Sequence, residues 1–161
     1  MVLLTMAQLM AKDMKINVII GGASFAATVE DTETGRAFYS LLPLALDMNE
    51  LNGNEKYHYL DSSLPTSSYR PGTINAGDIM LYGSSCVVLF YETFSSNYSY
   101  TRIGAIDNAD GLSQILGNGN VTVKFEAQSP TLDRGDMNGD GDVNIGDVSS
   151  LIDYLLTGNR Q

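Results

Sequence analysis

The sequence predicts a mainly β protein, a closed barrel with short flanking helices, followed by a small C-terminal segment. Short β-prone runs recur along residues 15–126, and glycine-containing turn signals separate them at close intervals. The composition, with 16 glycines and 9 tyrosines, also favours strands and turns over helices. A sandwich is the alternative to a barrel, whereas a parallel α/β sheet would need a helix after each strand. We therefore expect a barrel.

The overall composition limits what the protein can be. A chain of 161 residues is long enough for one medium domain plus a small appendage. The formal net charge of -10 and the pI near 4.2 would repel a phosphate backbone, so no nucleic acid partner is expected. No apolar run approaches the roughly 20 residues that cross a bilayer, so no membrane span is expected either.

A hairpin and a helix are the first expected elements. Ile16–Ile20 and Phe25–Val29 are β-prone runs on either side of a Gly-Gly pair, which predicts a hairpin. Apolar residues then recur at three- and four-residue spacing from Ala37 to Leu42, after the capping oxygens of residues 31–34. Pro43 stops this pattern. We expect a short amphipathic helix that covers one end of the barrel.

Strands and turns make up the rest of the barrel. Residues 44–64 are strand-like with a loop at 52–54, which places His58 on a strand, and residues 65–72 are expected to form a loop. The apolar run Cys86–Tyr91 is expected to be buried on both faces. The remaining strands are predicted at Ile79–Tyr82, Tyr98–Ile106 and Val121–Phe125, and a short helix at Asp110–Leu116 is closed by Gly117.

Four segments are expected along the chain. Residues 1–14 are an N-terminal extension, since Met14 begins a second plausible translation start and no signal peptide is visible. Residues 15–126 form the barrel, and the polar stretch 127–135, which contains one proline, is a linker. Residues 136–158 form a segment of different character.

This last segment predicts a calcium-binding loop of the EF-hand kind at residues 136–147. Calcium takes six to eight oxygen ligands, and glycine at the sixth loop position, Gly141, permits the sharp turn that wraps the ion. An acidic turn exposed to solvent is the alternative, and an aspartate at the last position makes magnesium a competitor. The predicted metal ligands are Asp136, Asn138, Asp140, Asp142 (through its carbonyl), Asn144 and Asp147.

An amphipathic helix is expected directly after the loop. Val148, Leu151, Ile152 and Leu155 fall on one face, Asp147 caps the start, and Gly158 ends the helix. Residues 128–133 do not predict an incoming helix, so the segment is a loop with an exit helix. In this it resembles a single dockerin repeat, which implies calcium binding and docking onto a protein partner.

Dockerins usually contain two such repeats, whereas this sequence has one. Three explanations stay open: a truncated gene product, a repeat that folds against the β domain, or two chains that pair their repeats. Loop positions 10 and 11, where cohesin-binding dockerins often have hydroxyl residues, are Ile145 and Gly146. Calcium binding is therefore expected without assuming a cohesin partner.

Residues 15–126 resemble a bacterial cyclophilin-like family. The resemblance rests on residues 41–44, 51–57, 77–83 and 100–104, and it implies a compact β-barrel flanked by short helices. Cyclophilins lower the barrier to proline isomerisation with an arginine, an aromatic pocket and a Gln-Gly-Gly segment, and that segment is absent here. No catalytic residue is carried over.

Candidate ligand residues in the barrel are Arg102, Tyr98 and Tyr100. On a strand, alternate residues share a face, so these three would line a groove for an extended peptide or a sugar, or else pack as part of the barrel. His58 has no partner fixed by spacing, and Cys86 sits in an apolar run, so both are expected to be structural.

Two function hypotheses follow. The first is a non-catalytic binding or adaptor protein, in which a Ca²⁺-binding dockerin-like repeat mediates a protein–protein interaction or pairs with another copy. The alternative is a peptidyl-prolyl isomerase or other small enzyme that uses the barrel cleft, whose turnover Arg102→Ala would abolish. A calcium repeat is typical of extracellular or cell-envelope proteins, although no signal peptide indicates export.

Overall fold

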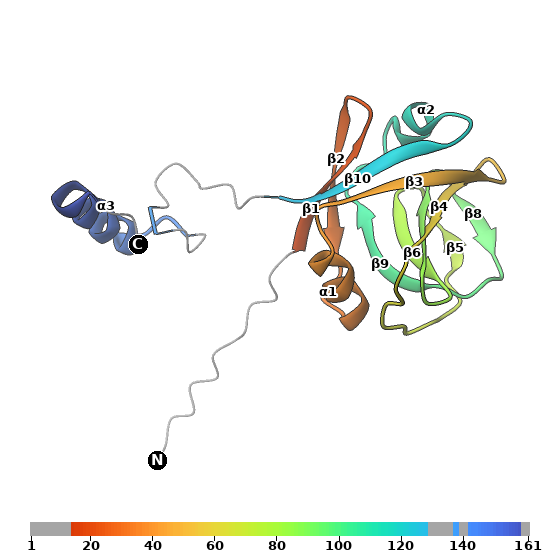
Figure 1. Ribbon diagram of the computed structural model, residues 1–161, viewed down its shortest axis with the longest axis horizontal. Coiled ribbons are helices and arrows are strands. Elements are labelled where there is room, and N and C mark those ends of the chain that lie inside the picture. Colours follow the sequence, from red (N-terminus) through yellow and green to blue (C-terminus); the bar gives the residue numbers. More distant parts are fainter. Residues whose placement is uncertain (1–13, 129–136, 139–141, 159–161) are drawn as a thin grey trace, which may run out of the picture. The chain divides into compact units, whose positions relative to one another are not determined.

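The structure is a computed structural model, and it describes residues 14–128, 137–138 and 142–158. The chain divides into two compact units, Met1–Ala127 and Gln128–Gln161. The first unit contains a closed eight-stranded barrel, in which all neighbouring strands are antiparallel (Figure 1). The mainly β fold expected from the sequence is confirmed.

The barrel strands do not follow chain order around the circumference. Their order is β1 (Met14–Ile20), β10 (Val121–Ala127), β3 (Leu44–Leu51), β4 (Glu55–Tyr59), β7 (Cys86–Phe90), β6 (Asp78–Tyr82), β9 (Thr101–Ile106) and β2 (Ala23–Val29), which returns to β1.

The predicted hairpin is confirmed as β1 and β2. Gly21, in the turn between them, has a φ of +58°, a conformation that glycine adopts without steric strain. Along β1 the side chains alternate between buried and half-buried, so Ile16, Val18 and Ile20 all point into the barrel. Met14 is the first residue of β1, and the rest of the expected N-terminal extension lies outside the described residues.

The predicted first helix is confirmed as α1 (Glu33–Ser40). The Thr32 side chain caps it by accepting a hydrogen bond from the Gly35 N–H at 3.0 Å. Phe38 is fully buried and makes an edge-to-face contact with Phe125 of β10, with ring centroids 5.4 Å apart. This contact anchors α1 against the barrel interior.

Two hydrophobic clusters stabilise the barrel, one inside and one on its outer surface. Strand β7 contributes to both, because Val87 and Leu89 point into the interior while Cys86, Val88 and Phe90 belong to the outer cluster. All five residues of β7 are buried, as the sequence predicted. The outer cluster is what distinguishes this side of the barrel from an ordinary solvent-facing surface.

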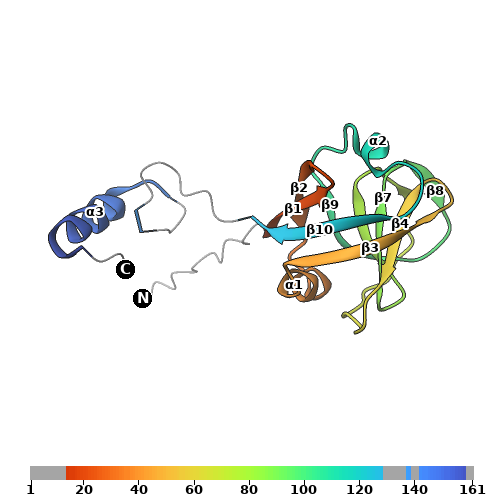
Figure 2. The same cartoon turned by 45° about the horizontal axis from the view of Figure 1, so that its top comes forward.

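A small two-stranded sheet, not predicted from the sequence, accompanies this outer cluster. It pairs β5 (Gly72–Ile74) with β8 (Phe94–Ser96); Ile74 belongs to the outer cluster, and Phe94 packs against it. The second helix, α2 (Leu112–Leu116), lies on the opposite side of the barrel from α1 in both views (Figures 1 and 2). These additions leave the strands β4, β7 and β6 facing outward beside the small sheet.

The second unit contains helix α3 (Ile145–Thr157), which confirms the predicted exit helix. It begins two residues before Asp147, because Asn144 is the N-cap and accepts a hydrogen bond from the Gly146 N–H at 2.7 Å. Asp147 completes a capping box from the third position, and Gly158 caps the C-terminus. No helix in the described residues is long and apolar enough to cross a membrane.

Candidate functional site

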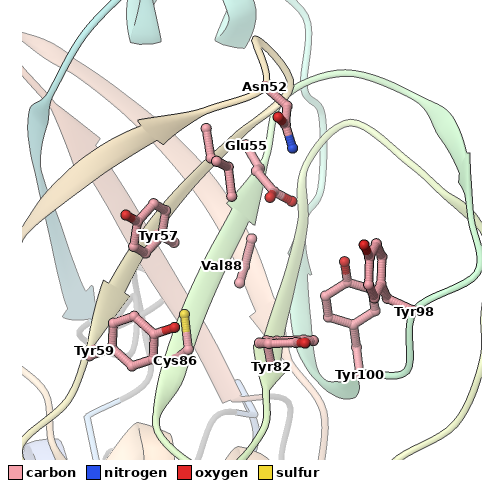
Figure 3. Close-up of a pocket in the computed structure, with 10 residues that line it drawn as sticks. Asn52, Glu55, Tyr57, Tyr59, Tyr82, Cys86, Val88, Tyr98 and Tyr100 are labelled. Atoms are coloured by element: carbon pink, nitrogen blue, oxygen red, sulfur yellow. The ribbon is translucent and has the colours of Figure 1, made fainter.

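A pocket of about 320 Å³ lies on the outer face of the barrel, over strands β4, β7 and β6 (Figure 3). Val88 and Cys86 of β7 lie between two groups of tyrosines. Tyr57 and Tyr59 of β4 form one group. The other group is Tyr82, Tyr98 and Tyr100, and Glu55, Leu51 and Asn52 complete the lining.

The alternation of β4 builds the first side of the pocket. Glu55, Tyr57 and Tyr59 occupy alternate positions and share the outer face, whereas Lys56 between them is fully buried. Tyr57 and Tyr59 contact each other edge to face, with centroids 6.0 Å apart and an interplanar angle of 82°. Two rings therefore meet at nearly a right angle on this side.

The other side of the pocket is assembled from β6 and the segment that precedes β9. The Tyr82 ring contacts Tyr98 edge to face at 6.3 Å and Tyr100 at 5.8 Å between centroids. Tyr100 is buried, and its N–H and C=O are both hydrogen-bonded to the backbone of Tyr69 at 2.9 Å. These contacts position three rings that come from two separate parts of the chain.

Glu55 is the one carboxylate in the pocket lining. It is half-buried, and within the part of the chain that the structure describes its carboxylate has no hydrogen bond or ion pair. Burial raises the pKa of this carboxyl, and the negative charge of nearby Glu50 raises it further. The pocket therefore contains an acidic group that its protein surroundings do not neutralise.

Cys86 lines the pocket as a protonated thiol. Burial raises its pKa to about 11, with a further contribution from the charge of Glu55, although a hydrogen bond with Tyr59 partly offsets the rise. Because the thiolate is the reactive form, a thiol with this pKa is a poor nucleophile at neutral pH. The structural role expected for Cys86 agrees with this environment.

We predict that iodoacetamide alkylates Cys86 at pH 8 roughly a hundredfold more slowly than an ordinary cysteine, whose pKa is about 8.5. The rate should continue to rise with pH beyond 10, because the thiol pKa is near 11. Mass spectrometry of timed samples measures it, and the urea-unfolded chain supplies the unprotected control. Rapid labelling with a plateau below pH 9 would show that the thiol is activated.

Behind Glu55, a buried ionic network connects β3 and β4 with the segment between α2 and β10. The Lys56 ammonium is fully buried and binds the Glu50 carboxylate, and it also donates to the carbonyls of Gly117 at 3.1 Å and Gly119 at 2.6 Å. The Tyr91 hydroxyl donates to both Glu50 oxygens, at 2.8 and 2.9 Å. This network fixes the β3–β4 hairpin that carries Glu55.

The pKa of Glu50 reflects two opposing effects. Burial raises it, but the hydrogen bonds from Lys56, from Tyr91 and from the Gly53 N–H together outweigh burial and lower the pKa below its ordinary value. Burial also raises the pKa of Tyr91, and the hydrogen bond from its hydroxyl to Glu50 raises it further. Glu50 is therefore held ionised and paired, in contrast to Glu55.

Of the three groove residues predicted from the sequence, the structure brings two into the pocket. Tyr98 and Tyr100 line it, but they precede β9 rather than lying on it, because the strand begins at Thr101. Arg102 does not line the pocket. Its guanidinium pairs with Glu30 at 2.7 Å and with Asp78 at 3.0 Å. The expected single strand face with all three residues is therefore not present.

His58 lies on a strand, as expected, but faces away from the tyrosines. Its Nδ1 is 2.8 Å from the Asp47 carbonyl oxygen, and the ring lines a second, separate cavity of about 470 Å³. Within the described residues, the His58 ring makes no hydrogen bond or ion pair with a carboxylate or a nucleophilic side chain. Its position suits a structural histidine.

Four residues of the pocket were not predicted as site residues: Glu55, Tyr57, Tyr59 and Tyr82. A signal was present, because Glu55, Tyr57 and Tyr59 alternate with period two and must share one face of a strand. Their meeting with Tyr82, Tyr98 and Tyr100 depends on the strand order around the barrel, which no local pattern encodes.

In the C-terminal unit, Asn138, Asp142, Asn144 and Asp147 of the predicted calcium loop are described, whereas Asp136 and Asp140 lie outside the described residues. Asp147 is buried, and one oxygen accepts hydrogen bonds from the Met137 N–H at 2.7 Å and the Asn138 N–H at 3.4 Å. Its other oxygen accepts from the Asn144 N–H at 2.6 Å. The Asp147 carboxylate thus joins the two described ends of the loop.

The side chains that are described have the donor chemistry that calcium prefers, since all four offer amide or carboxylate oxygens. Within the described residues there is no group of three or more His, Cys, Asp or Glu side chains that could hold a metal ion. A complete ligand set would need Asp136 and Asp140, which belong to the same twelve-residue segment.

Comparison with known proteins agrees with the architecture of the first unit. A solution structure of a hypothetical protein from Archaeoglobus fulgidus matches with a TM-score of 0.56 and 18% identity, over 72% of this chain and 95% of that chain. This likeness establishes the fold alone. No curated protein matches the chain. The model of the cyclophilin-like family matches residues 18–126, which is more than half of the chain. The chain belongs to the cyclophilin-like family.

Proposed function

We propose that this protein is a non-catalytic binding protein, in which the outer pocket of the barrel holds a ligand and a calcium-binding, dockerin-like repeat mediates a protein–protein interaction. The observation that carries the proposal is the chemistry of the pocket. Tyrosine rings and an apolar floor supply contact area, and one carboxylate supplies specificity, which is the usual composition of a binding site.

The same lining supports binding over catalysis. Nucleophilic catalysis needs a nucleophile next to a base that activates it. Cys86 is the thiol in the lining, and its pKa of about 11 keeps it protonated at neutral pH. His58, the single histidine of the sequence, lines a different cavity. The residues gathered in the pocket are thus suited to contact and not to covalent chemistry.

The isomerase alternative gains little support from the placement of Arg102. Proline isomerisation has a barrier of about 18–20 kcal/mol, and an arginine lowers it by hydrogen bonding to the twisted amide. Arg102 instead pairs with Glu30 and Asp78, away from the tyrosine pocket. An arginine whose donors are engaged by two carboxylates is poorly placed to contact a peptide in that pocket.

The calcium part of the proposal is supported by the spacing of oxygen side chains in residues 136–147 and by the position of Asp147. Asn138, Asp142, Asn144 and Asp147, with Asp136 and Asp140, would hold the ion. Calcium would neutralise the acidic loop and hold it closed at the start of α3. Asp147 would give up hydrogen bonds to loop N–H groups in exchange for the metal.

The docking part of the proposal is supported by the surface of α3. Apolar side chains on this helix are exposed: Ile145 by 80%, Val148 by 49%, Leu151 by 40%, Ile152 by 49%, Leu155 by 72% and Leu156 by 79%. An exposed apolar stripe of this kind is typical of a surface that packs against a partner. A protein partner, or the same repeat of a second chain, would cover it.

Calcium added to the chelator-stripped protein should shift the amide resonances of the predicted loop, residues 136–147, and of the helix that follows it, and leave those of the barrel strands in place. Asp147→Asn should abolish these shifts, because the buried carboxylate closes the loop. Asp153→Asn is the matched control, since Asp153 is exposed on the same helix but outside the loop. Equal responses in the two variants would contradict the assignment of the loop as the calcium site.

A further inference from the structure

We infer that the tyrosine pocket binds an organic cation, an alkylammonium or guanidinium group, with Glu55 as its counter-charge. This inference rests on the proposed binding function and names the chemical class of its ligand. The group is either a small amine or the end of a lysine or arginine side chain of a peptide. Both sources present the same chemistry to the pocket.

The charge distribution of the pocket is the first argument. Among the described residues that line the pocket, Glu55 is the single charged side chain, and none is a lysine, arginine or histidine. Lys56, the neighbour of Glu55 in the sequence, is fully buried and binds Glu50, Gly117 and Gly119. Arg102 is paired with Glu30 and Asp78. Among the described residues, no lysine or arginine therefore pairs with the half-buried Glu55 carboxylate, which can accept a cationic ligand.

The aromatic walls are the second argument. A positive charge is attracted to the electron-rich face of an aromatic ring, and several rings around one space form a cage for ammonium groups. Tyr57 with Tyr59, and Tyr82 with Tyr98, meet at 82° and 86°, so each pair forms a corner. Figure 3 shows these corners on opposite sides of Val88, with Glu55 between them at one end of the pocket.

Size and floor restrict the ligand further. A volume of about 320 Å³ is at the lower end of ligand sites and suits one head group with its neighbouring methylenes. Val88 and the protonated Cys86 offer an apolar floor for those methylenes. An anion would be repelled by the Glu55 charge, and a neutral sugar could donate hydrogen bonds to the carboxylate but would supply no counter-charge. A compact organic cation satisfies both the rings and the carboxylate.

The environment of Glu55 is unfavourable in the protein without ligand. Burial and the charge of Glu50 raise the pKa of the Glu55 carboxyl, so the ionised form is disfavoured. A bound cation would reverse this by pairing with the carboxylate. If Glu55 serves binding and not stability, a protein with its neutral isostere, glutamine, at this position should fold at least as stably but bind the cation more weakly.

The test uses matched probes and the whole protein. Choline is compared with its neutral isostere, in which carbon replaces the ammonium nitrogen, and N-acetyl-lysine methylamide is compared with the norleucine equivalent. Resonances of the tyrosine rings and of the backbone of β4 and β7 report binding to the pocket. The lysine pair also distinguishes a peptide side chain from a free amine.

Each cation should bind about tenfold or more tightly than its neutral partner. Glu55→Gln should remove this preference while its urea midpoint stays equal to or above that of the natural protein. Tyr98→Leu should weaken cation binding, and Tyr98→Phe, which keeps the ring, should not. Glu33→Gln, an exposed carboxylate on α1 outside the pocket, controls for the change in net charge.

Any of four outcomes would overturn the inference. If cations bind no better than their neutral partners, or if Glu55→Gln binds them equally well, the ligand is not a cation held by Glu55. Should neutral sugars or uncharged peptides shift the pocket resonances while cations do not, the binding function would stand and the cation inference would fail. If no probe of any class shifts these resonances, both would fail.

Discussion

Glu50→Ala is expected to destabilise the barrel by about 3 to 5 kcal/mol, because it leaves the Lys56 ammonium buried without its counter-charge. Lys56 has no exposed side-chain surface, and Glu50 is the carboxylate that it binds. The carbonyls of Gly117 and Gly119 would still accept hydrogen bonds from the ammonium, but they carry no net charge. The Tyr91 hydroxyl would also lose its acceptor.

Urea unfolding followed by tyrosine fluorescence measures this effect, since the chain has nine tyrosines and no tryptophan. Glu126→Ala is the control, because Glu126 pairs with Lys124 at the exposed surface and its loss should change stability by less than about 1 kcal/mol. The double variant Glu50→Leu with Lys56→Met should recover much of the loss. A loss below 1 kcal/mol for Glu50→Ala would contradict the described network.

The pH dependence of stability should change in the same variant. The folded protein lowers the pKa of Glu50, so the stabilisation from this ionised carboxylate is present above its ordinary pKa of 4.5 and is lost as the pH falls through the lower folded value. The natural protein should therefore lose stability in acid more steeply than Glu50→Ala. Parallel urea midpoints for the two proteins between pH 6 and pH 3 would be inconsistent with a paired Glu50.

Gly104→Ala should destabilise the barrel by roughly 3 kcal/mol or more, through steric overlap with the neighbouring strand. A Cβ atom at Gly104 would lie 2.2 Å from the Thr28 carbonyl oxygen and 2.9 Å from the Val29 Cα. Both contacts are with the backbone of β2, which cannot rotate away as a side chain would. The pairing of β9 with β2 is one of the contacts that close the barrel.

Gly22→Ala provides the comparison, because a Cβ atom there meets nothing within 4 Å. That variant should unfold within about 0.5 kcal/mol of the natural protein, while Gly104→Ala unfolds at a clearly lower denaturant concentration. Thermal and urea unfolding followed by circular dichroism measure both. Equal stability of the two variants would mean that β9 and β2 are not as closely paired as described.

The fold was predictable where local patterns carry the information. The Gly-Gly turn identified the β1–β2 hairpin, the spacing from Ala37 to Leu42 identified α1, and the apolar run at Cys86 identified the doubly buried β7. The strands β5 and β8 were not predicted. Each has three residues, which is too short for an alternating pattern, and their pairing depends on contacts distant in sequence.

The site was harder to predict because its residues meet through the barrel topology. Lys56 is the clearest example, because a lysine on a strand is ordinarily exposed to solvent, yet Lys56 is fully buried while Tyr57 and Tyr59 line a pocket. Arg102, in contrast, was expected to line a groove, but its guanidinium is held in ion pairs. Its partners, Glu30 and Asp78, come from segments far away in the sequence, and only the neighbouring strands of the barrel bring them together.

The C-terminal segment follows its local pattern where the structure describes it. The apolar spacing and Gly158 predicted the helix, and α3 ends where expected. Its start was placed two residues late, because Asn144 caps the helix and Asp147 acts from its first turn. Calcium ligation by residues 136–147 stays a prediction, since it depends on a loop whose first and fifth positions, Asp136 and Asp140, lie outside the described residues.

Calorimetric titration of calcium into the purified, chelator-stripped protein tests the proposed function most directly. Asp136→Ala serves as the control, and sedimentation with and without the ion runs in parallel. We predict one site per chain with micromolar or tighter affinity that the variant loses, and a calcium-dependent dimer would support pairing of two repeats. Heats indistinguishable from those of Asp136→Ala would contradict the account and leave the barrel pocket as the functional part of the chain.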